Sequence, residues 1–130
     1  MTTPRYNEGK TMEFDFYHKL YEIDTHLKDM DEGGVDISVL GIAQWNLRGK
    51  EICIALNDGM ARAVREHPDR IMACAQVPVG DGTEAAVQEI NRGIQELGLH
   101  AVALLSSNLD ITLSDERMFP IYEAIQKLNV

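Results

Sequence analysis

The four histidines are the side chains best suited to chemistry, and His26 is the one that most resembles a metal ligand. It closes the stretch "IDTH". Alternate residues of a strand share one face, so a second ligand would have to stand at position 24 or 28. Asp24 and Lys28 occupy those positions, and Lys28 would put a positive charge beside the metal. Because His26 also falls within a helical pattern of apolar residues, we expect an ordinary helix residue there.

The other histidines offer no better metal site. His18 and His26 would lie roughly 12 Å apart along one helix, at about 1.5 Å per residue, whereas a zinc ion needs both nitrogens about 2.0–2.1 Å away. His67 precedes Pro68 at an expected helix end, where a cation suits the negative end of the helix dipole. His100 opens an expected strand at its amino end, and barrel active sites gather at the opposite end. We therefore predict no catalytic and no metal-binding residue.

Two cysteines, Cys53 and Cys74, are too few and too widely spaced for a zinc knuckle or a disulfide framework. Both stand in apolar segments, which predicts two buried free thiols and a reducing, cytoplasmic location. The amino-terminal residues include no apolar stretch typical of a secretory signal. No apolar run approaches the roughly 20 residues that a membrane span needs.

Composition indicates an ordinary soluble globular domain. The chain has 130 residues, of which 45% are hydrophobic and 25% charged. Its formal net charge of −9 argues against a nucleic-acid or anionic-membrane surface, since both select for clustered Lys and Arg.

Apolar residues recur at helical spacing in segments that alternate with short apolar runs. Residues 1–16 are expected to be a loop or extension, and residues 17–130 a single domain. Asp81 and Glu84 stand at the spacing of a capping box, and Pro120 suits a first helical turn. The expected helices are 17–33, 50–67, 84–98 and 120–128, and the expected buried strands are 35–43, 70–79 and 100–105.

Strands that alternate with helices of this length predict a parallel sheet joined by right-handed crossovers. A closed (β/α)₈ barrel needs about 250 residues, so these three strands would be a segment of one. The first expected helix has no strand before it, and the chain stops where a fourth strand should begin. The expected fold class is therefore α/β, a partial TIM barrel that is incomplete at both ends.

The loops at the carboxyl ends of the strands hold the best candidates for a ligand pocket. Trp45 and Asn46 follow the first strand, and Ser106 and Asn108 follow the third. Trp45 would stack on an aromatic ring, while Ser106 and Asn108 would donate hydrogen bonds to a substrate carboxylate. The same residue types are also favoured in turns and helix caps, so a purely structural role stays open.

Three stretches carry a resemblance to a known family. They are "LKDMDEGGVDISVL", "NDGMARAVREHPDRIMACAQVPVGDGTEAAVQEINRGIQELGLHAVAL" and "DERMFPIYEAIQKLNV". Their order and spacing resemble the amidohydrolase-related family, and within it the branch of aminocarboxymuconate-semialdehyde decarboxylase and the aromatic-acid decarboxylases. The resemblance covers roughly residues 21–130.

This resemblance implies a metal-dependent (β/α)₈ barrel with zinc or another divalent ion. The reaction would be non-oxidative decarboxylation or hydrolysis of a small carboxylated or cyclic substrate. The family's metal ligands stand on its first, fifth and eighth strands, whereas this chain would correspond to strands two, three and four. No ligand or catalytic residue carries over, so we expect the chain to bind no metal and to be inactive alone.

Two other functions remain open. A small flavodoxin-like or receiver-like regulatory domain would fit the α/β alternation, but "GIAQWN" and "ACAQVPVG" do not supply the acidic residues that a receiver needs. The second open function is that of a truncated paralogue that acts by association with a partner protein. A partial parallel sheet exposes unpaired backbone and apolar surface, which predicts self-association.

Overall fold

The computed structural model describes residues 21–42 and 45–130, except for the side chain of Asn46. The chain divides into two compact units, residues 1–36 and 37–130. The expected loop at 1–16, the expected start of the first helix at 17 and His18 all lie outside the described residues.

In the first unit, helix α1 spans Ile23–Gly33 and ends as the two glycines predict. Gly34 has a φ of 68°, a left-handed conformation that glycine adopts without a steric penalty. The N–H of Val35 then donates to the carbonyl of Met30 at 2.8 Å, which satisfies one of the last carbonyls of the helix. His26 lies within α1 and is half-buried, so its helical placement is confirmed.

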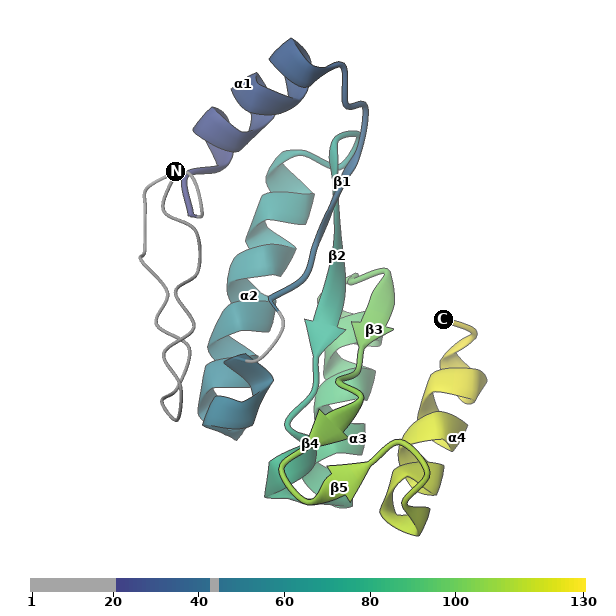
Figure 1. Cartoon of the computed structure of the whole chain (residues 1–130). Coiled ribbons are helices and arrows are strands. Elements are labelled where there is room, and N and C mark those ends of the chain that lie inside the picture. Colours follow the sequence, from purple (N-terminus) through teal and green to yellow (C-terminus); the bar gives the residue numbers. More distant parts are fainter. Residues whose placement is uncertain (1–20, 43–44) are drawn as a thin grey trace, which may run out of the picture. The chain divides into compact units, whose positions relative to one another are not determined.

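A parallel sheet forms the centre of the second unit, and its strands follow one another in chain order, β1-β2-β3 (Figure 1). Ser38 pairs with Ile71 in the first ladder, and Cys74 pairs with Ala101 in the second. The α/β class with parallel strands is confirmed. The strands are β1 (Ser38–Leu40), β2 (Ile71–Gln76) and β3 (Ala101–Ala103).

Three helices accompany this sheet, close to their predicted positions. Helices α2 and α3 contact β2, and α4 packs against α3 (Figure 1). A π turn that the sequence pattern did not predict continues α3 over Arg92–Glu96, and the N–H of Leu97 donates to the carbonyl of Arg92 there. The helices are α2 (Lys50–Glu66), α3 (Thr83–Asn91) and α4 (Phe119–Leu128).

The prediction that the first strand is buried on both faces is wrong. Strand β1 has three residues, and the central one, Val39, is 59% exposed. Along β2, Met72 and Cys74 are half-buried, while Ala73 and Ala75 on the other face are fully buried. The reason is that α2 and α3 cover only the face that carries Ala73 and Ala75. We call the opposite face, with Val39, Met72 and Cys74, the open face.

The covered face of the sheet holds the hydrophobic core. Gly93 brings α3 close to the strand: a Cβ added to this glycine would lie 3.0 Å from the Cβ of Ala75. Val102 in β3 and Leu104 just after it pack against the core cluster as partly buried residues. The buried cluster consists of Val77, Val79, Ala86, Ile90, Ile111, Met118 and Ile121.

The predicted capping box at Asp81 and Glu84 is wrong. Asp81 ends a short 3₁₀ turn (Val79–Asp81), and the residue that precedes α3 is Gly82, which has no side chain with which to cap. The hydroxyl of Thr83, the first residue of α3, donates to the carbonyl of Arg117 at 3.1 Å. The turn therefore displaces Asp81 from the capping position.

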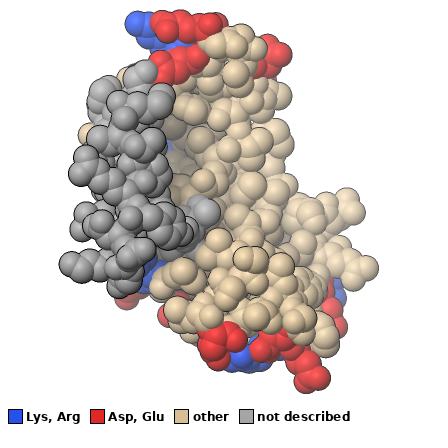
Figure 2. All heavy atoms as spheres, in the orientation of Figure 1, with Lys and Arg blue, Asp and Glu red and all other residues tan. Residues whose placement is uncertain are grey.

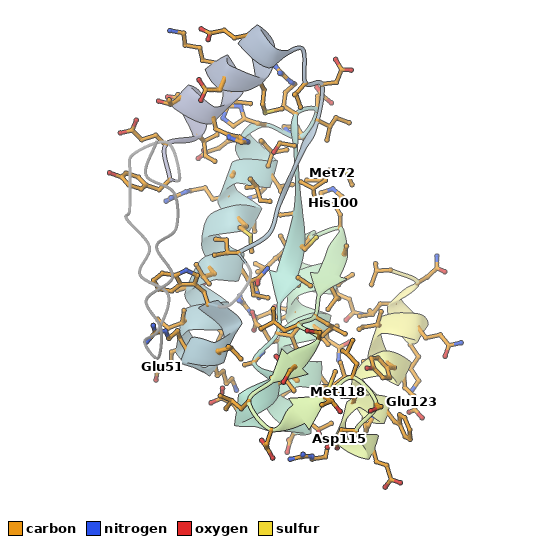
Figure 3. The ribbon with its side chains drawn as sticks, viewed as in Figure 1. Glu51, Met72, His100, Asp115, Met118 and Glu123 are labelled. Atoms are coloured by element: carbon orange, nitrogen blue, oxygen red, sulfur yellow. The ribbon has the colours of Figure 1, made fainter. Side chains whose placement is uncertain are left out.

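The expected polar loop after β3 contains an antiparallel hairpin of β4 (Ser107–Asn108) and β5 (Ile111–Thr112). Ile111 anchors this segment in the core. The Tyr122 hydroxyl of α4 donates to the carbonyl of Leu113 at 2.5 Å. Asp115 accepts a hydrogen bond from the Arg117 N–H and so caps the 3₁₀ turn before α4 (Figure 3).

Candidate functional site at the carboxyl ends of the strands

The two candidates after β1 lie in a 3₁₀ turn, Trp45–Arg48, which leads into α2. Trp45 is half-buried. The side chain of Asn46 lies outside the described part of the structure. Stacking of Trp45 on an aromatic ring stays a prediction.

The two candidates after β3 differ in exposure. Ser106 is exposed, whereas Asn108 in β4 is only 2% exposed. The Asn108 side-chain amide donates to the carbonyl of Leu105 at 3.4 Å, which is a local turn contact. A role of Ser106 and Asn108 in ligand binding therefore remains a prediction.

A different residue stands out at the end of β2. Gln76 is fully buried, and its side-chain oxygen Oε1 has no hydrogen-bond partner within residues 21–42 and 45–130. By strand alternation its side chain lies on the same face as Met72 and Cys74, but unlike these two half-buried residues Gln76 is not exposed to solvent. Gln76 was not among the site residues predicted from the sequence. A signal was present, because Gln76 is the one amide side chain within the apolar run "IMACAQVPV".

Buried Asn57, from α2, holds the backbone of Gln76. Its Oδ1 accepts a hydrogen bond from the Gln76 N–H at 2.7 Å, and its Nδ2 donates to the Gln76 carbonyl at 2.9 Å. This pair of hydrogen bonds resembles the contacts of a neighbouring strand residue. It satisfies the backbone at a position beyond the end of β1, whose last residue, Leu40, pairs with Ala73.

Charged side chains hold Asn57 in position through hydrogen bonds. Its Nδ2 also donates to the carboxylate of Glu89, at 2.7 Å, and Glu89 is 3% exposed. Arg92 donates to both Glu89 oxygens, at 2.7 and 2.8 Å, and to Asp58 at 2.7 Å. The hydrogen bonds to Glu89, followed by those to Asp58, raise the pKa of Arg92 above its usual value despite the opposing effect of burial. The buried Glu89 charge is thus paired, as a buried charge must be.

Cys53 lies in the same region, and its environment suppresses its reactivity. Burial first, then the negative charges of Glu89 and Asp81, raise the pKa of the Cys53 thiol from 9.0 to about 11. Because the thiolate is the nucleophilic form, this cysteine is unsuited to covalent catalysis near neutral pH.

Metal-binding geometry does not arise within residues 21–42 and 45–130. Nowhere in these ranges do three His, Cys, Asp or Glu side chains gather into a group that could hold an ion. His100 has a backbone partner instead, since its Nδ1 accepts from the N–H of Ala73 at 3.4 Å; Figure 3 labels it near Met72. In the same described ranges, no helix has the length and apolar character to cross a membrane.

The order of strands and helices, together with the hydrogen bonds at the carboxyl end of β2, can be compared with known proteins. A sequence profile described as amidohydrolase matches residues 18–130. The chain belongs to the amidohydrolase family. This match confirms the family resemblance found in the sequence.

Two curated amidohydrolase-family relatives are decarboxylases. The 2-amino-3-carboxymuconate-6-semialdehyde decarboxylase of Dictyostelium discoideum is 31% identical over 115 residues, which cover 83% of this chain and 32% of that protein. The gamma-resorcylate decarboxylase of Rhizobium radiobacter is 37% identical over 89 residues, 62% of this chain and 27% of that protein. The chain thus spans about a third of the length of these relatives.

Solved structures agree with these relatives. The 2,6-dihydroxybenzoate decarboxylase from Rhizobium superposes with a TM-score of 0.72 at 26% identity, over 82% of this chain and 37% of that one. The 5-carboxyvanillate decarboxylase from Novosphingobium aromaticivorans, solved with manganese and 4-hydroxy-3-methoxy-5-nitrobenzoic acid, has a TM-score of 0.75 at 25% identity, over 81% and 32%. The resemblance to the decarboxylase branch is confirmed, and a divalent metal occurs in this family.

Proposed function

We propose that this chain forms strands two to four, with their helices, of a (β/α)₈ barrel in a metal-dependent decarboxylase of small aromatic or cyclic carboxylic acids. The observation that carries the proposal is a parallel sheet with one face covered by helices and one face open, in a chain that resembles only about a third of each decarboxylase. In a closed barrel the open face would point inward. Residues 17–130 would then be one part of that domain, after an extension at 1–16.

The character of the open face supports this proposal. Val39 and Ile37 are 59% and 52% exposed, which is unusual for neighbouring β-branched residues in and beside a strand. Figure 2 shows that the surface over β2 and β3 in this view carries almost no charged side chains. Such apolar surface typically becomes buried against another part of a protein.

The described residues do not fit a metal ion, because no group of suitable ligands gathers among them. Manganese bound to the 5-carboxyvanillate decarboxylase favours a divalent ion, zinc or a similar metal, in the intact enzyme. Its ligands would come from outside the described part, and this chain would contribute the shape and polar groups of the pocket. Trp45, Asn46, Ser106 and Asn108 are the proposed pocket-rim residues.

Two measurements on the purified chain test the proposal that it is inactive alone. We expect less than stoichiometric manganese or zinc by elemental analysis after dialysis. We also expect no release of CO₂ from 2,6-dihydroxybenzoate when manganese is supplied. Stoichiometric metal together with turnover would show that these residues suffice for catalysis. The proposed division of the barrel would then be wrong.

A hydrolase reaction remains the alternative within the same family. A cyclic amide or lactone assayed beside the carboxylic acid would separate the two reactions in a full-length relative that carries these residues. We favour decarboxylation because the two curated relatives and both compared structures described above carry that activity in their names.

A further inference from the structure

In the part of the chain that the structure describes, the buried side-chain oxygen of Gln76 lacks a hydrogen-bond partner. Gln76 is 0% exposed, and within the described ranges its Oε1 is the buried side-chain polar atom left without a partner. An unpaired buried acceptor destabilises the folded state, because it has lost its hydrogen bonds to water and gained none in return. Such a group calls for a specific explanation, for example a ligand or a bound water.

The geometry also determines what kind of partner is missing. The Gln76 Nε2 donates to the carbonyl of Cys74 at 3.2 Å. Exchanging the amide oxygen and nitrogen would set two acceptors against each other, so this contact fixes which atom is free. The free atom is an acceptor, and the missing partner must therefore be a hydrogen-bond donor. A carboxylate cannot be that partner, because an ionised carboxylate only accepts hydrogen bonds.

Gln76 cannot easily move to find a partner elsewhere. Asn57 holds both its backbone N–H and its carbonyl, and Glu89 and Arg92 hold Asn57. The oxygen is thus presented by a fixed strand end, which is how a binding group is kept in position before its ligand arrives.

Gln76 also stands where parallel sheets bind ligands, at the carboxyl end of its strand. The 2,6-dihydroxybenzoate decarboxylase and the 5-carboxyvanillate decarboxylase were solved with hydroxylated aromatic acids. We propose that Gln76 is a specificity residue whose Oε1 accepts a hydrogen bond from a ring hydroxyl of a hydroxylated aromatic ligand. This inference rests on the proposed function and adds to it a requirement for a hydroxyl group.

Nuclear magnetic resonance on the full chain tests this inference with three probes. 2,6-Dihydroxybenzoate has hydroxyls and a carboxylate, resorcinol has hydroxyls alone, and benzoate has a carboxylate alone. We expect the Gln76 side-chain amide signals to shift with the first two probes and to stay in place with benzoate. Because Cys74 shares the open face, its backbone signal should shift together with them.

Two variants sharpen the experiment. Gln76→Met keeps the length of the side chain but removes the acceptor, and we expect it to weaken binding of resorcinol and 2,6-dihydroxybenzoate about tenfold, as the loss of one hydrogen bond predicts. Gln126→Met, at an exposed position of α4, is the matched control and should bind both probes as the unaltered chain does. If Gln76→Met does not fold, the titrations of the unaltered chain with the three probes still test whether Gln76 contacts a ring hydroxyl.

The outcomes separate the inference from the proposed function. Equal shifts with benzoate, or no response of Gln76 to any probe, as expected for an oxygen bound by an internal water, would overturn the role of Gln76. Shifts confined to other residues at the carboxyl ends of the strands would overturn it too, while leaving the proposed function in place. Turnover by the chain alone would count against the proposed function without bearing on the hydroxyl contact.

Discussion

At the scale of single residues, the two cysteines show how strongly position controls reactivity. Cys53 is fully buried beside negative charge, and Cys74 is half-buried on the open face. Sequence analysis predicted two buried free thiols. Cys53 confirms that prediction, whereas Cys74 is only half-buried because no described helix covers its face of β2.

We predict that an aromatic disulfide reagent, which releases a coloured thiolate when it reacts with a cysteine, modifies one cysteine of the folded chain and two cysteines of the denatured chain. With a pKa of about 11, Cys53 is thiolate in on the order of one molecule in a thousand at pH 8, and its burial blocks access as well. Cys74→Ser should therefore abolish the rapid reaction, and Cys53→Ser should leave it intact. Rapid modification of both thiols in the folded chain would contradict this view.

Asp115 gives a prediction for pH. The side chain of Arg117, and then its backbone N–H, donate hydrogen bonds to this carboxylate and lower its pKa from 3.8 to about 2. A carboxylate whose pKa is depressed on folding stabilises the folded state above its unfolded pKa, and this stabilisation is lost as the pH falls through the folded pKa. Asp115→Asn should therefore lower the melting temperature at pH 7 and have progressively less effect below about pH 4. Asp69→Asn, in an exposed turn, is the control for the loss of one negative charge.

At the scale of elements, the contact between α3 and β2 depends on a glycine. The π turn and Gly93 let the helix backbone approach Ala75. Apolar periodicity predicted a helix over 84–98, and Ala86 and Ile90 of that segment are fully buried, but periodicity did not predict the π turn. The turn depends on how the helix meets the sheet rather than on local preference.

Gly93→Ala should destabilise the protein by about 1–3 kcal/mol, because the new methyl would lie 3.0 Å from the Cβ of Ala75, which has no rotamer with which to move away. Gly59→Ala in α2 is the matched control. Nothing lies within 4 Å of its added Cβ, so it should stabilise the helix by about 0.5–1 kcal/mol. Urea unfolding measures both changes, and a loss of stability in Gly59→Ala would count against this account.

Elements were predictable where apolar periodicity was strong. Helices α2 and α4 lie close to their predicted bounds. Strand β1 was overestimated because residues such as Ile37 are apolar without being paired in a strand. The β4–β5 hairpin was missed because its polar residues indicate a loop, while its anchor, Ile111, is a single apolar residue. At the candidate site, sequence analysis selected side chains typical of loops, whereas Gln76 lies in a strand and its unpaired oxygen is visible only in three dimensions.

At the scale of the whole molecule, the open face decides how the isolated chain should behave. Apolar residues that a closed barrel would cover remain in contact with solvent, and burying them against a second copy is the available way to remove them from water. A cytoplasmic location and a small-molecule ligand remain predictions for the intact enzyme.

We predict that the chain self-associates in a concentration-dependent way and that Val39→Asp weakens this association. A charge at an already exposed position should repel a second copy at little cost to folding. Ile52→Asp, at a 37% exposed position on α2, is the control and should associate like the unaltered chain. Sedimentation velocity distinguishes the species, and a clean monomer with cooperative unfolding would exclude self-association.

The sequential order of the sheet has a consequence for how the protein is made. Because β1, β2 and β3 are neighbours in the order in which they leave the ribosome, each strand needs only the one synthesised before it. Contacts that are local in sequence form quickly and require little loop closure. We therefore expect the second unit to fold progressively during translation, with the β1–β2 pair and α2 in place before β3 emerges.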